Sequence, residues 1–483
     1  MNKRFLLPAL LVLIGLPLFS QNTFTIGDII DRAITQSPAS KQAETRKENR
    51  FWQYRSFRTN YNPQLRLNGS APSFSQSYIP VRQNDGTIIF RPINQTNSTM
   101  NLGLQQPLQW TGGNLSINSG LNFFNDIERS TNQWSGTVFN IQLNQPIFAF
   151  NRLRWDRQTE PLRYEESRRE FAEQHEFISR QAVDLFFQVL QFQIDLQIAR
   201  FNLANNDTIY KIEQGRYNIG TTSQDKLLQV ELQLLRSRQA VAQASLDLET
   251  AALRLRSYIG LREDAQFDLV LPDQIPSFGI SVDEALGLAK QNRADFIAFE
   301  RRRLEAERDV AEARGNRFQT SLTASYGLNN SAFVANEIYV NPQRQQQVNV
   351  TFNIPIMDWG RNKAAMQTAL ANKRLNDYII AQDEVTFEQE ITTQVRQFEM
   401  LRLQIEITKK SDEVAQERYN VAQNRYLIGK IDITNLNIAL TEKDDAKRSY
   451  IQALRSFWTA YYDLRRLTLY DFANRRLLYT PED

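Results

Sequence analysis

Apolar and polar residues alternate strictly along several segments of the chain, among them residues 138–144 and 348–354. Alternation with a period of two predicts β-strands, because successive side chains of a strand point to opposite faces. One face of these strands is apolar, and the other carries Asn, Gln, Thr and Ser with few charges. A soluble β-sandwich usually exposes Lys and Glu, so this pattern favours strands with an apolar outer face around a hydrated lumen.

Large aromatic residues lie at or just beyond the ends of these segments. Aromatic girdles mark the two interfaces of a membrane β-barrel, although packing in an ordinary core accounts for such residues as well. The residues concerned are Trp110, Phe123, Phe124, Trp134, Phe148, Phe150 and Trp359.

A different pattern, with apolar residues at i, i+3 and i+4, predicts helices over residues 26–60 and 282–316. Residues 162–214 and 362–426 are rich in Leu, Gln, Arg and Glu, and we expect them to form long coiled-coil-like helices. Gly220 and Gly429 supply the left-handed residue at which such helices end. Thr222 or Ser223, and Asp432, are good N-caps for return helices that end near residues 258 and 467.

The same order of elements occurs twice. Arg-Tyr-x-Ile-Gly ends at Gly220 and again at Gly429, 209 residues later, and Pro146 and Pro355 are separated by the same offset. The opening helices repeat at 256 residues, as Ala33 and Ala289 show. We therefore divide the chain into a signal peptide (1–20), a first repeat (21–279), a second repeat (280–472) and a C-terminal tail (473–483).

The two offsets differ by 47 residues, which predicts an additional β-hairpin in the first repeat. Residues 104–108 resemble residues 143–147, and residues 110–114 between them form a tight-turn sequence. The first repeat then has strands within about 64–146, with a long outer loop over about 73–97. The second has strands within about 320–355 and a loop near 331–344. We expect six strands per chain, with four as the conservative alternative.

Composition excludes most site chemistry. The 483 residues include no cysteine and one histidine, His175, so disulfides, thiolate ligands and multi-histidine metal centres are excluded. We expect no catalytic site, metal or cofactor. The net charge of +3 gives no support for nucleic-acid binding, and a mean hydropathy of −0.49 is low for a bundle of membrane-spanning helices. Residues 1–20 have the basic start and apolar run of a signal peptide, so the chain is expected to be exported.

Neither four nor six strands suffice for the smallest membrane barrel, which needs about eight. Open sheet edges cannot lie in hydrocarbon, because their amides would lack partners. The strand count therefore predicts self-association around one shared barrel.

The duplicated order of helix, strands and helical hairpin, with paired Tyr-x-x-Gly tips, resembles the TolC family of outer-membrane efflux proteins over about residues 24–472. The resemblance implies an α+β membrane protein with two internal structural repeats. Its long antiparallel coiled-coil-like helices form a periplasmic tunnel, and its strands contribute to a shared outer-membrane β-barrel. It also implies a homotrimer in the outer membrane of a Gram-negative bacterium, extending into the periplasm. Such a trimer is a passive exit duct of a tripartite efflux or type I secretion system. A periplasmic adaptor (a membrane fusion protein) joins it to the inner-membrane transporter that drives export.

Family members usually contribute four strands per chain, so six would permit an eighteen-stranded barrel instead of the usual twelve. The acidic ring of well-known members is also absent, because its positions hold Asn435 and Ile438. The resemblance implies a periplasmic gate around the second tip, with Tyr426 retained from the family pattern. The candidate gate residues are Tyr426, Asn435, Asp432, Asp225 and Lys226, and the candidate adaptor-docking residues are Tyr217, Ile219, Gly220, Thr221, Thr222, Ile428, Gly429 and Lys430.

The alternative function is a periplasmic coiled-coil scaffold or adaptor that forms no pore. It accounts for the long helices but not for the neutral strands placed before each of them. The exported substrate cannot be read from the sequence, since selection belongs to the transporter.

Overall fold

The computed structural model describes residues 22–261, 267–272 and 274–479. The predicted signal peptide lies outside the described residues. The chain forms two compact units, and each draws on both repeats. Among the described residues, one unit, the hairpin unit, contains 22–43, 172–286 and 391–479, and the other, the sheet unit, contains 44–171 and 287–390.

The helices occur in pairs of equal length, as the duplicated sequence predicts. Both long helices have 67 residues and both return helices have 36. The opening segments give helices of 11 and 22 residues in each repeat. In the first repeat the helices are α1 (Ile26–Gln36), α2 (Pro38–Thr59), α3 (Arg152–Asn218) and α4 (Gln224–Ile259). In the second they are α5 (Val282–Asn292), α6 (Ala294–Gly315), α7 (Arg361–Leu427) and α8 (Ile433–Thr468).

Each opening segment is broken into two helices, so the prediction of one continuous helix was wrong. In the first repeat the break is Ser37, which is extended at φ −65° and ψ 147°. The residue before a proline avoids the helical region, and Pro38 is well suited to the first position of α2. Arg293 has a similar extended backbone between α5 and α6 without a following proline. The break therefore belongs to the repeat rather than to one proline.

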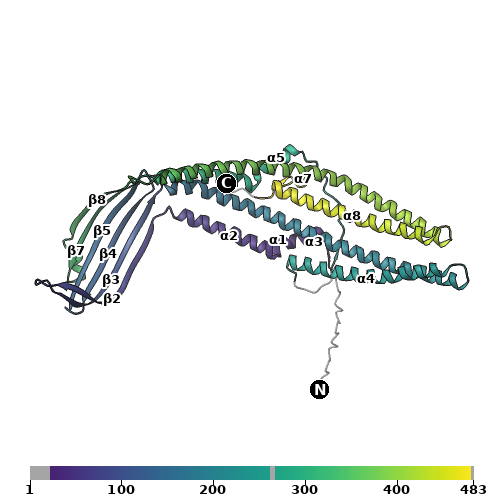
Figure 1. Cartoon of the computed structure of the whole chain (residues 1–483), viewed down its shortest axis with the longest axis horizontal. Coiled ribbons are helices and arrows are strands. Elements are labelled where there is room, and N and C mark those ends of the chain that lie inside the picture. Colours follow the sequence, from purple (N-terminus) through teal and green to yellow (C-terminus); the bar gives the residue numbers. More distant parts are fainter. Residues whose placement is uncertain (1–21, 262–266, 273, 480–483) are drawn as a thin grey trace, which may run out of the picture. The chain divides into compact units, whose positions relative to one another are not determined.

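The sheet unit contains one antiparallel sheet of six strands in the order β2-β3-β4-β5-β7-β8, which Figure 1 shows as a curved layer. This confirms six strands rather than four. The strands are β2 (Gln64–Arg82), β3 (Ile88–Leu108), β4 (Gly113–Asp126), β5 (Thr131–Ile147), β7 (Gln319–Ala332) and β8 (Gln343–Asn353).

The long outer loop expected over residues 73–97 is absent. Ser73 instead pairs with Asn97, and the ladder continues to Arg82 opposite Ile88. The chain reverses at residues 83–87, where Gln83 N donates to Thr87 O at 2.8 Å and Gly86 has a φ of 85°. The loop was predicted because residues 73–97 are polar and do not alternate clearly, but they belong to β2, the turn and β3. The tight turn before Gly113 and the loop between β7 and β8 are confirmed, the latter with a short 3-10 helix, η1 (Ala335–Tyr339).

The two faces of the sheet differ in polarity, as the alternation predicts. Leu65, Leu104, Ile117, Ile141 and Tyr326 lie opposite one another on five successive strands. Directly opposite residues of antiparallel strands share a face, so these side chains form an apolar row across the sheet. The intervening positions hold mainly Asn, Gln, Ser, Thr and Gly. Among the described helices, none has a stretch long and apolar enough to cross a membrane.

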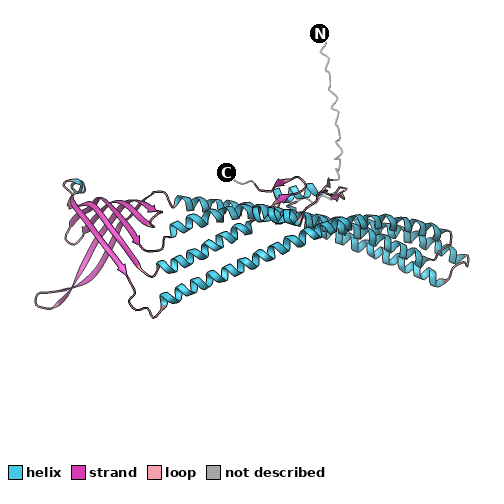
Figure 2. Ribbon diagram, turned by 90° about the horizontal axis from the view of Figure 1, so that it is seen from above, coloured by secondary structure: helices cyan, strands magenta, loops and turns pink. Residues whose placement is uncertain are grey.

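The hairpin unit contains the ends of α3 and α7 with α4 and α8. Its two helix–turn–helix ends lie at the same end of this unit (Figure 2). Two small sheets complete it: β1 (Asn22–Phe24) with β6 (Phe267–Leu269), and β9 (Tyr470–Asp471) with β10 (Arg476–Leu477). The last helix ends at Thr468, and β10 lies in the segment expected to be only a tail.

Candidate functional site

The tips of the two helical hairpins share one backbone design. Gly220 and Gly429 both have a φ of 76°, which confirms the left-handed conformation predicted for them. Gly220 N donates to Tyr217 O at 2.9 Å, and Gly429 N donates to Tyr426 O at 2.9 Å. The amide of the residue after each glycine donates to the carbonyl five residues earlier, at 2.9 and 2.8 Å. These paired bonds form the Schellman motif and satisfy the last carbonyls of α3 and α7.

Each return helix begins with a side-chain cap. Of the two candidates in the first repeat, Ser223 is the N-cap of α4 and accepts from Lys226 N at 3.4 Å. Asp432 is the N-cap of α8 and accepts from Asn435 N at 2.9 Å and from the Asn435 side-chain amide at 2.9 Å. Two residues predicted for the gate, Asp432 and Asn435, therefore bind each other and fix the start of α8.

Tyr426 forms the contact that joins the two tips. Its hydroxyl donates to Oε1 of Glu213 at 2.8 Å, and Arg216 Nη1 donates to the same oxygen at 2.7 Å. The guanidinium of Arg216 also lies 5.7 Å from the centre of the Tyr426 ring. Glu213 and Arg216 belong to α3 and Tyr426 belongs to α7, so this cluster links the first repeat to the second. We call Glu213, Arg216 and Tyr426 the tip latch.

Glu213 and Tyr426 of the tip latch are buried although they lie within two turns of the helix ends, whereas the Arg216 side chain is 31% exposed. Glu213 is 5% exposed and Tyr426 is 3% exposed. Burial alone would raise the pKa of Glu213, but hydrogen bonds from Tyr426, Arg216 and Thr222 outweigh it and hold the pKa below its usual value. Burial, followed by the hydrogen bond to Glu213, raises the pKa of Tyr426. The latch at neutral pH is therefore a neutral phenol and a guanidinium on one carboxylate.

Apolar side chains from all four helices surround the latch. Ile209 of α3, Val230 of α4 and Leu436 of α8 pack in one cluster with Tyr426. This cluster excludes water from the carboxylate, which strengthens the hydrogen bonds made to it.

A second buried polar group lies further along the same helices. The ammonium of Lys443 is 4.3 Å from the ring centre of Phe201, 4.7 Å from that of Tyr419 and 3.3 Å from Asp444. Asp444 also accepts from the Asn202 amide at 2.7 Å. Buried polar groups of this kind fix the register of packed helices, because a shift of α8 would take Lys443 away from the rings of Phe201 and Tyr419 and Asp444 away from the Asn202 amide.

The remaining candidate residues lie around the two turns. Thr222 is half-buried and hydrogen-bonded to Glu213. The others are exposed, namely Asp225, Lys226, Tyr217, Ile219, Gly220, Thr221, Ile428, Gly429 and Lys430. Ile219 and Ile428 occupy equivalent positions and are 74% and 66% exposed. Each tip therefore exposes one isoleucine side chain at the equivalent position of its turn.

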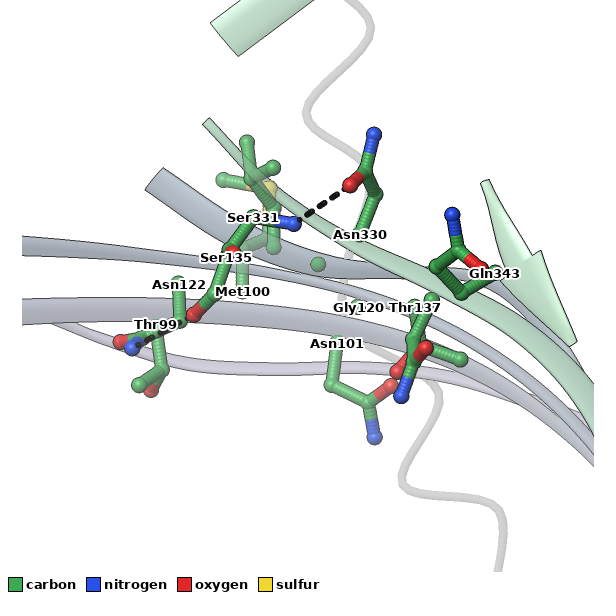
Figure 3. A pocket seen from close by; sticks show the side chains of 13 residues that line it. Thr99, Met100, Asn101, Gly120, Asn122, Ser135, Thr137, Asn330, Ser331 and Gln343 are labelled. Atoms are coloured by element: carbon green, nitrogen blue, oxygen red, sulfur yellow. Dashed lines mark hydrogen bonds between the residues drawn. The ribbon is translucent and has the colours of Figure 1, made fainter. Parts of the chain in front are cut away.

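A hollow of about 550 Å³ lies in the sheet unit. Figure 3 shows side chains from β3, β4, β5, β7 and β8 around it, including Thr99, Asn122, Ser135 and Gln343. None of its lining residues is charged. In the described part of the chain, no group of three His, Cys, Asp or Glu residues could hold a metal ion.

The duplicated hairpins and the amphipathic sheet have counterparts among known proteins. The sequence pattern of the outer membrane efflux protein family matches residues 29–261 and 285–468. This chain belongs to that family. No curated protein matches the sequence.

Solved channels share the fold at low sequence identity. The outer membrane channel CmeC of Campylobacter jejuni is 15% identical with a TM-score of 0.66, over 92% of this chain and 85% of CmeC. VceC of Vibrio cholerae is 15% identical with a TM-score of 0.63, over 92% of this chain and 95% of VceC. The open state of MtrE of Neisseria gonorrhoeae is 17% identical with a TM-score of 0.62, over 94% of this chain and 91% of MtrE.

Membership of the outer membrane efflux protein family establishes the general function. The chain is an outer-membrane channel protein that extends into the periplasm and serves as an exit duct for efflux. Proteins of this family form trimers and work with adaptor and inner-membrane pump partners. The family consists of transport channels rather than enzymes.

Sequence reasoning missed Glu213, the central residue of the tip latch. Its spacing of three residues from Arg216 predicts an ion pair on one helix face. Nothing local indicates that Tyr426, 213 residues away, completes the group. Only the packing of α7 against α3 brings the two together.

Proposed function

We propose that this chain forms a homotrimeric exit duct of a tripartite efflux or type I secretion system. The trimer is a passive channel for small molecules or proteins. An inner-membrane transporter supplies the energy, and a periplasmic adaptor connects the transporter to the duct. The observation that carries the proposal is the six-stranded amphipathic sheet, with its two open edges, in a chain of the efflux family.

Exposed aromatic residues support the position of this sheet in the outer membrane. Trp110, Phe148 and Trp359 follow the ends of β3, β5 and β8 and are 88%, 86% and 91% exposed. Because β3, β5 and β8 run in the same direction, the three residues lie at the same end of the strands. A row of exposed aromatic side chains at one end of the strands fits the headgroup region of a bilayer.

The helices of the hairpin unit support assembly with further copies. On α7, Met400, Ile407, Val414 and Val421 recur every seven residues, and each is 52–57% exposed. An exposed apolar residue at every seventh position is the pattern of a helix that packs against another helix. On α4, Leu232, Leu246 and Leu253 lie at the same position of a seven-residue repeat, with Gln239 between the first two, and are also exposed. In the trimer, the α7 stripe of one copy packs against the α4 stripe of the next.

The experiment separates this duct from a periplasmic scaffold. We expect the protein in outer-membrane fractions as a trimer that resists SDS until heated, and we expect discrete conductance steps in planar bilayers. Val414→Asp should abolish the trimer, whereas Gln416→Asp, at an exposed position off the stripe, should leave it intact. Release of the wild-type protein by salt or osmotic shock, without any conductance, would instead support the scaffold.

The tips carry the proposed gate and the proposed docking surface. The tip latch closes the gate, because it ties α3 to α7 through a bond that can open without unfolding either helix. Asp432 and Asn435 hold the start of α8, and Asp225 and Lys226 lie exposed in the first turn of α4 as further gate residues. Tyr217 and the turn residues Ile219, Gly220, Thr221, Thr222, Ile428, Gly429 and Lys430 form the adaptor surface.

Photo-crosslinking in cells tests the docking surface. A photoreactive residue at Thr221 should capture the periplasmic adaptor, and one at Glu417, exposed on α7 away from the turn, should not. Equal capture at both positions, or capture at neither, would remove the tips as the docking site.

A further inference from the structure

Both outer strands of the six-stranded sheet lack a neighbour on one side within the described chain. The sheet begins with β2 and ends with β8, and β8 is exposed along all its 11 residues. A sheet edge presents a row of unpaired amide and carbonyl groups. In hydrocarbon, where water cannot replace the missing partners, such an edge is not tolerated. In the membrane, each edge therefore needs another strand.

The apolar face of the sheet continues onto both edge strands. Leu65 and Leu67 of β2 are 66% and 64% exposed, and Val348 and Val350 of β8 are 75% and 55% exposed. Leu67 lies opposite Leu102, and Val350 lies opposite Leu322. The edge strands thus have the same lipid-facing pattern as the strands between them, as expected of strands within a barrel wall.

The base of the sheet shows that the β2–β3 hairpin repeats the design of the β4–β5 hairpin. Near the end of β3, the amide of Gln106 donates to the carbonyl of the next proline at 2.8 Å and to Tyr61 O at 2.9 Å. Near the end of β5, the amide of Gln145 donates to the carbonyl of the next proline at 2.8 Å and to Thr111 O at 3.0 Å. In each case the second acceptor lies just before the hairpin. The additional hairpin is therefore anchored like its neighbour, as part of the wall and not as an appendage.

We infer that β2 of one copy pairs with β8 of the next copy, so that each copy gives six strands to one closed barrel. The six strands alternate in direction, so β2 and β8 run in opposite directions. When the copies stand side by side in a ring with the same orientation, β2 of one copy therefore pairs antiparallel with β8 of the next. In the trimer of the proposed function, on which this inference rests, three copies of six strands make an eighteen-stranded barrel. Barrel diameter grows with strand number, which makes this lumen wider than one built from four strands per copy.

The alternation of side chains limits the register of the new pair. Opposite residues share a face, so Leu67 lies opposite Val348, Val350 or Phe352, which are the apolar positions of β8. Since β2 has 19 residues and β8 has 11, the distal part of β2 extends beyond its neighbour.

Cysteine crosslinking tests the pairing directly, because the native chain contains no cysteine. Leu67→Cys is combined with Val348→Cys, Val350→Cys or Phe352→Cys in the full-length protein, and outer membranes are treated with a short thiol crosslinker. Within one copy these positions are roughly 24 Å apart along the sheet, five strand spacings of about 4.8 Å. A short link must therefore join two copies. We expect at least one pair to give covalent dimers and trimers on denaturing gels, and each single variant to give none.

Two further pairs make the outcome decisive. Asn68→Cys with Val350→Cys places one thiol on the lumenal face and should not link. Leu115→Cys with Val350→Cys would link if β4, rather than β2, met the neighbouring copy. Linking by the Leu115 pair, or SDS-resistant trimers in which no Leu67 pair links, would overturn the eighteen-stranded barrel and leave the duct intact. Absence of any trimer from the outer membrane would overturn the proposed function itself.

Discussion

The two hairpin tips have the same backbone but place equivalent tyrosines in opposite environments. Both turns close on a glycine with a φ of 76°. Tyr217, three residues before the first glycine, is 41% exposed, whereas Tyr426, three residues before the second, is 3% exposed. Tyr426 donates to Glu213 at 2.8 Å. The position of the second repeat that is equivalent to Glu213 is Ala422.

The two repeats therefore share the backbone of the turn and differ in the side-chain contact. A helix end with a left-handed glycine depends on local sequence alone. The latch needs a carboxylate on one hairpin and a phenol on the other, so the two repeats must differ. If the two tips had identical side chains, each would carry both a tyrosine and a glutamate, or neither tip would carry the pair. The tips would then be joined by two tyrosine–glutamate hydrogen bonds or by none.

The largest effect is expected from removing the acceptor of the latch. Glu213→Ala deletes the hydrogen bonds that Tyr426, Arg216 and Thr222 donate to the carboxylate, of which the bond from Tyr426 joins α3 to α7. A hydrogen bond to a charged group is worth about 1.5 kcal/mol or more. We expect local opening of the tips to become easier by about 3 kcal/mol, measured by hydrogen exchange of the tip amides, with a larger single-channel conductance in planar bilayers. Ala422→Ser, at the equivalent position of the second repeat, is the control. Unchanged conductance with intact trimers would show that the latch does not close the channel.

Removing one donor should have a smaller effect. Tyr426→Phe deletes a single hydrogen bond to Glu213 and keeps the ring in its apolar cluster. We expect tip opening to become easier by about 2 kcal/mol and conductance to increase. Tyr217→Phe changes the equivalent, exposed tyrosine and should leave both quantities unchanged. Equal responses of the two variants would contradict the asymmetry of the tips.

Acid should weaken the same contact in the wild-type protein. Hydrogen bonds hold the pKa of Glu213 below its usual value despite burial. A carboxyl group with a lowered folded-state pKa stabilises the fold above its unfolded pKa, near 4.3 for glutamate. That contribution is lost as pH falls from about 4.3 through the folded-state pKa. Conductance should therefore rise below about pH 4, and Glu213→Gln should flatten this rise. A pH response that Glu213→Gln leaves unaltered would assign the effect to other groups.

The sequence predicted the duplicated elements because they depend on local signals. Gly220 and Gly429 fixed the ends of the long helices, and both return helices end within one residue of the predicted positions, at Ile259 and Thr468. The 47-residue difference between the repeats correctly predicted an additional hairpin, which gives six strands. Each of these features is specified by spacing or by a residue with special backbone freedom.

The errors concern features that packing decides. The segment over residues 73–97 is polar and irregular in pattern, yet backbone pairing between β2 and β3 makes it two strands. The helix break at Arg293 is not followed by a proline, so no local signal in the sequence predicts it. Glu213 resembles many other acidic residues of the helices until α7 places Tyr426 beside it. Such features depend on neighbours that are distant in sequence.

The smallest effect on the stability of the tips is expected from replacing the glycine that both turns contain. Gly220→Ala and Gly429→Ala each place a side chain on a residue with a φ of 76°. A methyl group at either position would meet nothing within 4 Å, so the cost comes only from the backbone. It should be about 1 kcal/mol and equal at the two tips, as measured by hydrogen exchange of the turn amides. A much larger cost at Gly429 than at Gly220 would mean that the latch depends on the exact path of the second turn. Equal costs would mean that the frame is symmetric and that the asymmetry resides in the side chains alone.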